Sequence, residues 1–373
     1  MSHPDLLYTD VEDALRSSVR DLLAARCPSD AVTALYDGDR SLVAPLWKSL
    51  AVDLGLGGLL VAEDRGGAGA SAREAAVVLE ELGRACAPVP FLTSSVVATA
   101  VLDAVPGDGG ELVAALAAGD RTAALALPLA TGSMSFRSAA TREGEVLSGL
   151  VRSVAGALEA DVLLMPVPTG GGSGVEVWAV DAEAVQVTPV VSLDMTRQVA
   201  DLSFHDVPLD GTAARLVVPA SEGESAVRSA LTLGAGLLAS EQVGIAQWCL
   251  DATVGYLLGR RQFGRVVGGL QALKHRLADV YVLVEQARAA ARYAAATAAT
   301  GDADAEVAAS VAQAYCADVA VRAAEECVQL HGGIGMTWEH PAHLYLKRAK
   351  ADQVAFGTPG AHRARLGELV DLA

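Results

Sequence analysis

The order of helix-forming and strand-forming segments most restricts what this 373-residue chain can fold into. After residue 220, apolar residues recur at helical spacing, and the composition is rich in Ala, Leu and Val, which favours helices that pack against one another. The predicted helices are 222–258, 270–300, 305–330 and 342–355, with a shorter one after Pro359. The sequence therefore predicts a C-terminal helical bundle over residues 221–373.

Two further segments precede this bundle. Residues 1–118 are predicted to be helical, because apolar residues recur at helical spacing within 11–23, and Ser71 with Glu74 forms a capping-box pattern that begins a helix. In residues 119–220, short apolar runs alternate with Gly, Pro and Asp, which is typical of strands and turns. These runs are 123–127, 162–167, 175–180 and 185–191. The chain is thus predicted to be an α+β protein of three domains, with a small middle β domain.

Charge and cysteine content exclude several classes of function. The formal net charge is −17, so the chain lacks the basic face that a nucleic-acid backbone requires. Its five cysteines are scattered without a C-x-x-C pair, which argues against a structural zinc site and for buried thiols in a reducing compartment. Neither a signal segment nor an apolar stretch of about 18 residues is found. We therefore expect a cytoplasmic protein that binds no nucleic acid, membrane or metal.

The first of two motifs in the C-terminal segment suits a dinucleotide ligand. It runs Arg260-Arg261-Gln262-Phe263-Gly264, and Gln271 follows it. Arg260 offers a planar fork of donors for pyrophosphate oxygens, Gln262 can donate and accept hydrogen bonds, and Phe263 is an apolar plate for an adenine. We expect Gly264 to end the preceding helix and to let the backbone approach the ligand.

The second motif is Gln329-Leu330-His331-Gly332-Gly333-Ile334-Gly335. Gln329 is expected to end a helix with its amide free, and Gly332 and Gly333 to let a ligand lie against the main chain. Taken separately, the two motifs could be an arginine at a helix end and a glycine-rich helix C-cap. Their occurrence together favours a cofactor site.

At these spacings the two motifs resemble those of the acyl-CoA dehydrogenase family, FAD-dependent enzymes that desaturate acyl-CoA thioesters. Residues 54–91, with an E-x-x-G-G-x-G turn, are similar to the N-terminal helical domain of that family. The resemblance covers nearly the whole chain, is weakest in the middle, and implies an N-terminal helical domain, a small middle β domain and a C-terminal four-helix bundle. In the family, the two motifs hold the ADP half of a FAD whose flavin ring lies in a neighbouring subunit. The FAD-binding residues that the resemblance implies are Arg260, Gln262, Phe263, Gln271, Gln329, Gly332 and Gly333.

The carboxylate that removes the substrate's α-proton in this family is missing from both positions where it occurs. Some members carry a Glu before a Gly-Thr pair after the last long helix, and this chain has Phe356 there. Others carry it on the first helix of the C-terminal domain, and the matching residue is Gly234, followed by Ala235. The flavin-facing stretch T-E-x-x-x-G-S-D also lacks its acids here, at 126–133. Loss of a general base typically slows an enzyme by about 10²- to 10⁴-fold.

These features favour one hypothesis and leave two alternatives open. The chain resembles the non-catalytic, β-type subunit of an actinobacterial heterotetrameric steroid-CoA dehydrogenase. We expect FAD as cofactor, no catalytic residue in this chain, and a homologous partner subunit that supplies the base. The resemblance implies a steroid side-chain acyl-CoA as substrate and an electron-transfer flavoprotein as acceptor. One alternative is a self-sufficient homo-oligomer with Glu241 as base, two helical turns after Gly234. The other is a flavin-free scaffold or acyl-CoA-binding protein.

Three histidines and a glycine run have simpler interpretations. His331, His340 and His343 lack the H-E-x-x-H spacing of a metal site. We expect His331 to line the cofactor cleft or a subunit contact. The glycine-rich run 170–174 is predicted to be a plain loop.

Overall fold

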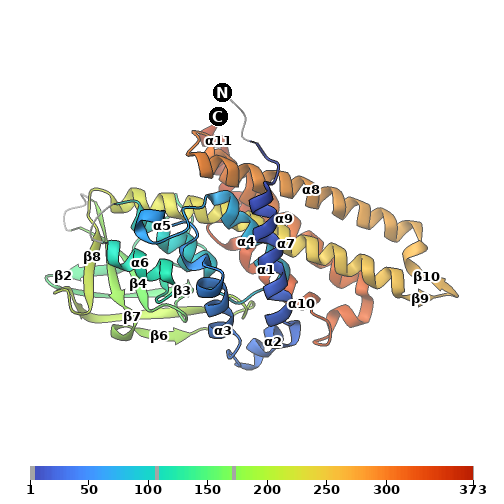
Figure 1. Cartoon of the computed structure of the whole chain (residues 1–373), viewed down its shortest axis with the longest axis horizontal. Coiled ribbons are helices and arrows are strands. Elements are labelled where there is room, and N and C mark those ends of the chain that lie inside the picture. Colours follow the sequence, from blue (N-terminus) through green and yellow to red (C-terminus); the bar gives the residue numbers. More distant parts are fainter. Residues whose placement is uncertain (1–4, 106–108, 170–173, 373) are drawn as a thin grey trace.

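Most strands lie apart from the long C-terminal helices. The computed structural model describes residues 5–105, 109–169 and 174–372, so most of the glycine-rich run 170–174 lies outside the described residues. Figure 1 shows the strands of the middle region on the left, while α7 and α8 extend to the right and end at the hairpin β9–β10. This arrangement confirms the predicted α+β architecture of helices, a β region and a second helical region.

The N-terminal region consists of short helices around α4. The helices are α1 (Asp10–Arg26), α2 (Ser29–Ala34), α3 (Val43–Lys48), α4 (Ala72–Ala85), α5 (Thr99–Asp103) and α6 (Gly110–Ala118). The predicted capping box begins α4: the Ser71 hydroxyl accepts a hydrogen bond from the Arg73 N–H, and Glu74 accepts one from the Ser71 N–H at 2.9 Å. In α1, Val19 and Leu23 are buried, whereas Val11 is exposed, so its apolar stripe begins later than the sequence predicted.

The middle region contains two four-stranded sheets. One has the order β1 (Ala123–Leu125), β4 (Val162–Pro168), β5 (Val175–Asp181), β8 (Ala214–Val218), and the other β2 (Ala140–Glu143), β3 (Val146–Ala155), β7 (Val199–Pro208), β6 (Gln186–Pro189). Only β1 and β4 pair in parallel among these described strands. Leu163 and Met165 of β4 pack with Phe204 in a core shared by the two sheets, whereas Leu164 joins the core shared with the helices. Because β4 is buried on both faces, its sequence is a continuous apolar run.

The C-terminal region is built on three long helices. Its helices are α7 (Gly223–Gly259), α8 (Gln271–Thr300), α9 (Ala305–His331), α10 (Ala342–Val354) and α11 (Pro359–Leu369), and the short strands β9 (Arg261–Gln262) and β10 (Arg265–Val266) lie between α7 and α8. None of the described helices is long and apolar enough to cross a membrane. The domain boundaries at 118/119 and 220/221 stay a prediction.

A close crossing of α4 and α7 joins the N-terminal region to the bundle. A Cβ atom at Gly244 would lie 1.9 Å from the carbonyl oxygen of Glu80, and one at Gly83 would lie 2.1 Å from that of Glu241. Only glycine fits at these two positions, since any side chain would push the helices apart. The crossing places Glu241 in the interior of the molecule, where it is 1% exposed.

Candidate functional site

The first motif forms a tight hairpin beyond the end of α7. This helix ends at Gly259, so Gly264 does not end it as predicted. Instead, β9 and β10 pair Gln262 with Arg265, and Phe263 and Gly264 form the two-residue turn between them. Both turn residues have positive φ angles, 50° and 75°, which suits the right-handed twist of a hairpin. A phenylalanine in this conformation is unusual, and its side chain is 91% exposed, which points to a functional constraint.

The polar residues of this motif face solvent. Arg260 follows α7, and its backbone N–H donates to the carbonyl of Tyr256 at 2.9 Å, while its side chain stays exposed, as does that of Gln262. Gln271 is the first residue of α8 and is also exposed, with its Nε2 3.4 Å from Nε2 of His275. These side chains therefore offer donors to a ligand outside the chain.

The second motif lies at the end of α9. Gln329 is exposed near the end of this helix, which continues to His331. Gly332 has φ 66° and ψ −141°, a conformation that is essentially restricted to glycine. A Cβ atom at Gly332 or Gly333 would meet no atom within 4 Å. The chain itself therefore leaves the space beside this backbone open.

A small apolar core holds the two motifs at the same end of the bundle. Leu257 of α7, Val267 after the hairpin and Leu330 of α9 are buried together. The Tyr256 ring also stacks on His331, with 4.5 Å between the ring centroids. In Figure 1 the hairpin β9–β10 lies at the end of the bundle farthest from the chain's own sheets. The exposed residues at this end are called the clamp surface: Arg260, Gln262, Phe263, Gln271, Gln329, Gly332 and Gly333.

The clamp surface fits the ADP half of a dinucleotide chemically. A guanidinium suits pyrophosphate oxygens, amides can donate and accept hydrogen bonds, and an exposed aromatic ring can cover a base. The glycines leave their backbone accessible. The surface lies at the end of the bundle farthest from the chain's own sheets (Figure 1).

The two positions where the base was sought face each other, and neither carries a carboxylate. A Cβ atom at Gly234 would lie 3.2 Å from Cζ of Phe356 and 2.9 Å from Cγ2 of Val97. Phe356 follows α10, is 6% exposed, and its N–H donates to the carbonyl of Leu129 at 2.8 Å. The cavity beside its ring measures only about 30 Å³ and is lined mainly by apolar side chains such as Leu231. Phe356 and Gly234, the two positions where the resemblance implied a base, thus pack against each other in an apolar interior.

Glu241 belongs to a buried cluster of charged groups. Its two carboxylate oxygens accept hydrogen bonds from Arg348 at 2.6 Å and from Arg197 at 2.5 Å. Arg348 also pairs with Asp194 at 2.8 Å, and Arg197 with Asp352. Burial raises the pKa of Asp352 to about 8. Because both oxygens of Glu241 are bonded to guanidinium groups and the residue is buried, the structure gives no support to Glu241 as the base.

Sequence reasoning missed a thiol–imidazole pair beneath the clamp surface. All five cysteines are buried, as predicted. Hydrogen bonds from Cys249 and His331 lower the pKa of Cys327 to about 5. His331 is 3% exposed and its Nδ1 donates to the carbonyl of Cys327 at 2.7 Å, so its ring lies inside the bundle. The i, i+4 spacing of Cys327 and His331 was the sequence signal for this contact.

A larger cavity of about 660 Å³ opens between α7, α8, α9 and α11. Small residues such as Gly236, Ala294 and Ala309 line it, and Arg228 and Arg365 lie among them. Both arginines pair with glutamates, Arg228 with Glu224 and Arg365 with Glu306, each at 2.8 Å. The cavity therefore offers a largely apolar surface whose two arginines are already neutralised.

Family models match both helical regions of the chain. Residues 9–105 match the N-terminal domain of acyl-CoA dehydrogenases, and residues 221–370 match their C-terminal domain. The chain is 34% identical to "Acyl-CoA dehydrogenase IpdE2" of Mycobacterium tuberculosis over 346 residues, which cover 92% of each chain.

Two solved complexes have similar chains. One is a variant of a complex described as "Tcur3481-Tcur3483 steroid ACAD", which is 28% identical, with a TM-score of 0.83, and the match covers 97% of this chain and 98% of that one. The other is the ChsE4-ChsE5 complex of Mycobacterium tuberculosis, which is 27% identical, with a TM-score of 0.84 and 99% coverage of both chains.

Proposed function

Because this chain belongs to the acyl-CoA dehydrogenase family, FAD-dependent oxidoreductases that act on CH–CH bonds, we propose that it is the non-catalytic subunit of a heteromeric acyl-CoA dehydrogenase. FAD, when bound, supplies the electron acceptor for α,β-desaturation of the acyl thioester. This chain contributes the clamp surface to a FAD seated on a homologous partner. The partner contributes the base, the pocket for the flavin ring and the acyl site.

One observation carries the proposal: the chain presents an exposed clamp surface, yet the positions for a base are occupied by Phe356 and Gly234. A phenyl ring accepts no proton, and the cavity of about 30 Å³ beside it leaves no room for an acyl group. An exposed phenylalanine at a hairpin tip is unfavourable in water, so we expect it to be retained only where it contacts a ligand or a partner. An active site shared between two unlike subunits explains both features: the exposed clamp surface and the lack of room for an acyl group beside Phe356.

The clamp residues hold the cofactor and take no part in proton transfer. Arg260 would neutralise and orient the pyrophosphate of a bound FAD, and Gln262 and Gln329 would hydrogen-bond to polar groups of the cofactor. Phe263 would cover the adenine. Gly332 lets the main chain approach the ligand.

We also propose a bulky steroid side-chain acyl-CoA as the substrate. The similarity to the chains of a complex described as a steroid enzyme, and to those of the ChsE4-ChsE5 complex, supports both the substrate class and a heteromeric assembly, a heterotetramer with twofold axes. An electron-transfer flavoprotein as acceptor and a location in the cytoplasm complete the proposal.

Flavin content tests the proposal directly. The chain is purified alone and after co-expression with a homologous chain that carries a base, and the visible flavin absorbance per protein is measured. We expect a colourless lone chain and a yellow complex with one FAD per pair of unlike chains. Full flavin and desaturase activity in the lone chain would refute the shared site.

A matched pair of variants tests the clamp surface. Arg260→Ala should release FAD from the complex, because the pyrophosphate loses its guanidinium, whereas Arg265→Ala removes another exposed arginine, in strand β10 of the adjacent hairpin, and should not. FAD affinity of the complex is measured by titrating the flavin-free protein. Equal losses in both variants would argue against a specific role for Arg260.

The cavity of about 660 Å³ favours a second candidate, a flavin-free protein that binds apolar acyl groups. Such a protein would bind an acyl-CoA alone, and Arg260→Ala would leave that binding unchanged. Calorimetric titration of the lone chain with acyl-CoA distinguishes the candidates, because the shared-site proposal expects no binding without the partner.

A further inference from the structure

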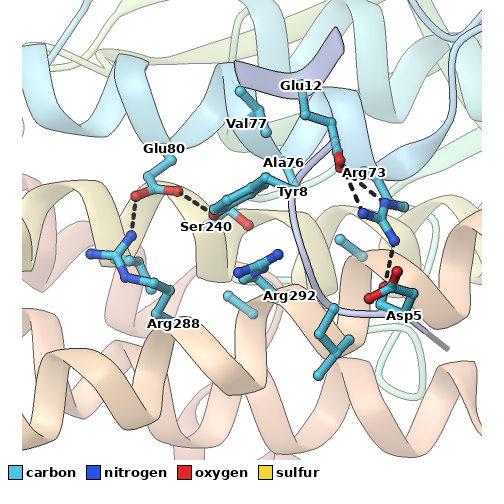
Figure 2. Close-up of a pocket in the computed structure, with 14 residues that line it drawn as sticks. Asp5, Tyr8, Glu12, Arg73, Ala76, Val77, Glu80, Ser240, Arg288 and Arg292 are labelled. Carbon is cyan, nitrogen blue, oxygen red and sulfur yellow. Dashed lines mark hydrogen bonds and ion pairs between the residues drawn. The ribbon is translucent and has the colours of Figure 1, made fainter. Parts of the chain in front are cut away.

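Most arginines of this protein pair with a carboxylate of the same chain. Figure 2 shows two of them: Arg73 is bonded to Glu12, and Arg288 is bonded to Glu80. Such pairing is expected in an acidic chain, whose 45 acidic residues outnumber its 28 lysines and arginines. A group of exposed cations that lacks carboxylate partners is therefore a candidate for contact with another molecule.

The hairpin end of the bundle holds such a group. Between Asp251 and Asp279 the sequence contains no acidic residue, but it contains four arginines and one lysine. In the part of the chain that the structure describes, no carboxylate lies within ion-pair distance of Arg261, Arg265 or Lys274, all of which are exposed. Positive charge therefore gathers at one end of a chain whose formal net charge is −17.

Lys274 lies where a positive charge is unfavourable for the fold. It is in the first turn of α8, and this turn has no acidic residue and no side-chain cap at Leu270. The helix dipole places partial positive charge at this end of the helix, so a cation there lowers the stability of the isolated chain. A residue that costs stability is more readily explained by binding than by folding.

Arg261 points away from the side of the hairpin that carries the clamp residues. The backbone is extended at Arg260, and Arg261 and Gln262 form β9. Successive side chains of an extended segment point to opposite sides, so Arg260 and Gln262 share one side and Arg261 lies on the other. If Arg260 and Gln262 face a bound FAD, the charge of Arg261 is left for a different partner.

Exposed apolar side chains precede the hairpin on α7. Leu258 is 65% exposed and Val254 is 37% exposed, and they lie one turn apart on the same face of the helix. Apolar side chains bordered by charged ones are typical of a protein–protein interface, whereas a small ligand is usually held in a cavity. The occupant of this surface is therefore expected to be a protein.

We propose that Val254, Leu258, Arg261 and Lys274 form a docking surface for an acidic face of the homologous catalytic subunit. The inference rests on the proposed function, because the same end of the bundle carries the clamp surface. A second copy of this chain is a poorer partner, since a twofold contact would bring the same cations of both copies together. The opposite charges accelerate the encounter of the two unlike chains, and the apolar side chains hold them together afterwards.

The rate of association of the two chains tests the docking surface. It is measured by biolayer interferometry with excess FAD, at about 0.05 M and about 0.5 M sodium chloride. We expect Arg261→Glu to associate about tenfold more slowly than the wild type at the lower salt concentration, and the difference to shrink at the higher one. The control is Arg152→Glu, which alters an exposed arginine of β3 and should keep the wild-type rate at both concentrations.

Lys274→Glu gives a second signature that a structural role would not. Removing the cation from the first turn of α8 should raise the thermal unfolding midpoint of the lone chain by about 1 °C. The same variant should nevertheless associate more slowly with the partner at low salt. In contrast, the FAD content of the assembled complex should be unchanged in Arg261→Glu and lost in Arg260→Ala.

The outcomes separate this inference from the proposed function. If the wild-type chains form no complex that contains FAD, the proposed function fails and the docking surface is rejected with it. If the complex forms, but Arg261→Glu and Lys274→Glu associate as fast as the wild type at low salt, only the docking surface is rejected. Loss of FAD from the assembled Arg261→Glu complex would assign Arg261 to the cofactor, and salt-sensitive self-association of the lone chain would assign the surface to a second copy. Either result would overturn the proposal.

Discussion

Replacing Glu241 by glutamine separates a catalytic role for this residue from a structural one. Glu241 is 1% exposed and accepts hydrogen bonds from Arg348 at 2.6 Å and Arg197 at 2.5 Å. A glutamine keeps the shape of the side chain, and its carbonyl oxygen can still accept from one guanidinium. Its NH₂ group, however, points a donor at the other guanidinium. One charge-assisted bond is therefore lost and the other is weakened.

The size of the effect follows from these two bonds. A hydrogen bond to a charged group contributes about 1.5–3 kcal/mol, and a guanidinium left without its partner adds to the loss. The cluster also compensates in part: burial and the charge of Glu241 both raise the pKa of Asp352, so a neutral residue at 241 lets Asp352 ionise more readily. We expect Glu241→Gln to lower the free energy of unfolding by about 3 kcal/mol. At about 2.1 cal/mol/K per residue, 373 residues have an unfolding entropy of about 0.8 kcal/mol/K, so the midpoint of thermal unfolding should fall by about 4 °C.

The assay combines calorimetry with turnover. The complex of this chain with its catalytic partner is heated to obtain the midpoint, and acyl-CoA desaturation per bound FAD is measured well below it. We expect a lower midpoint with unchanged turnover. A variant complex as stable as the wild type, but slower by about 10²-fold or more, would refute the structural role and make Glu241 a candidate base.

Three further substitutions test other parts of the structure. The folded-state pKa of Asp352 is raised from 3.8 to about 8, so the native state holds a proton that the unfolded state releases, and stability falls as pH rises through this interval. Asp352→Asn should remove this fall in the free energy of unfolding, which is measured by denaturant unfolding at several pH values across the interval. If the free energy of unfolding of the wild type did not change with pH there, the raised pKa of Asp352 would be contradicted. Gly83→Ala places a Cβ 2.1 Å from the carbonyl oxygen of Glu241 and should cost about 1–3 kcal/mol of stability by the same assay, whereas Gly255→Ala on α7 meets no atom within 4 Å and should cost nothing. Phe356→Glu puts a carboxyl at the family's base position but in a closed apolar cavity, so the lone chain should stay inactive; desaturation by that variant would show that a competent acyl site is present.

The long helices could be predicted from the sequence because apolar residues recur along them at the spacing of an α-helix. The predicted run 162–167 corresponds to β4, which is buried on both faces and is therefore a continuous apolar run, whereas the predicted run 185–191 corresponds to β6, which is largely exposed. β2 gave no such signal, because Thr141, Arg142 and Glu143 are all exposed. The strand β3 was missed for a similar reason, since it carries Gly149 and several exposed residues in its middle.

Some parts of the candidate site could likewise be predicted from the sequence, and others could not. Each half of the clamp surface is a contiguous motif at a helix end, so its residue types could be recognised without knowledge of their neighbours. The charged cluster brings together Asp194, Glu241 and Arg348 from three distant segments, and no local spacing links them. Glu241 was considered as a base because it lies on the same helical face as Gly234. What the sequence did not reveal was that α10 places a buried guanidinium against it.

The exposure of Phe263 and the open space beside Gly332 have a consequence for genetics. A side chain as exposed as that of Phe263 contributes little to the folding of its own chain, so truncating it should leave the purified subunit close to wild-type stability. If the active site is shared as proposed, a substitution in the clamp surface would instead lower the affinity of the partner subunit for FAD. Extra copies of the partner's gene would not rescue it, and only an intact copy of this gene would complement the loss. Selection on the clamp surface would therefore act through the other subunit.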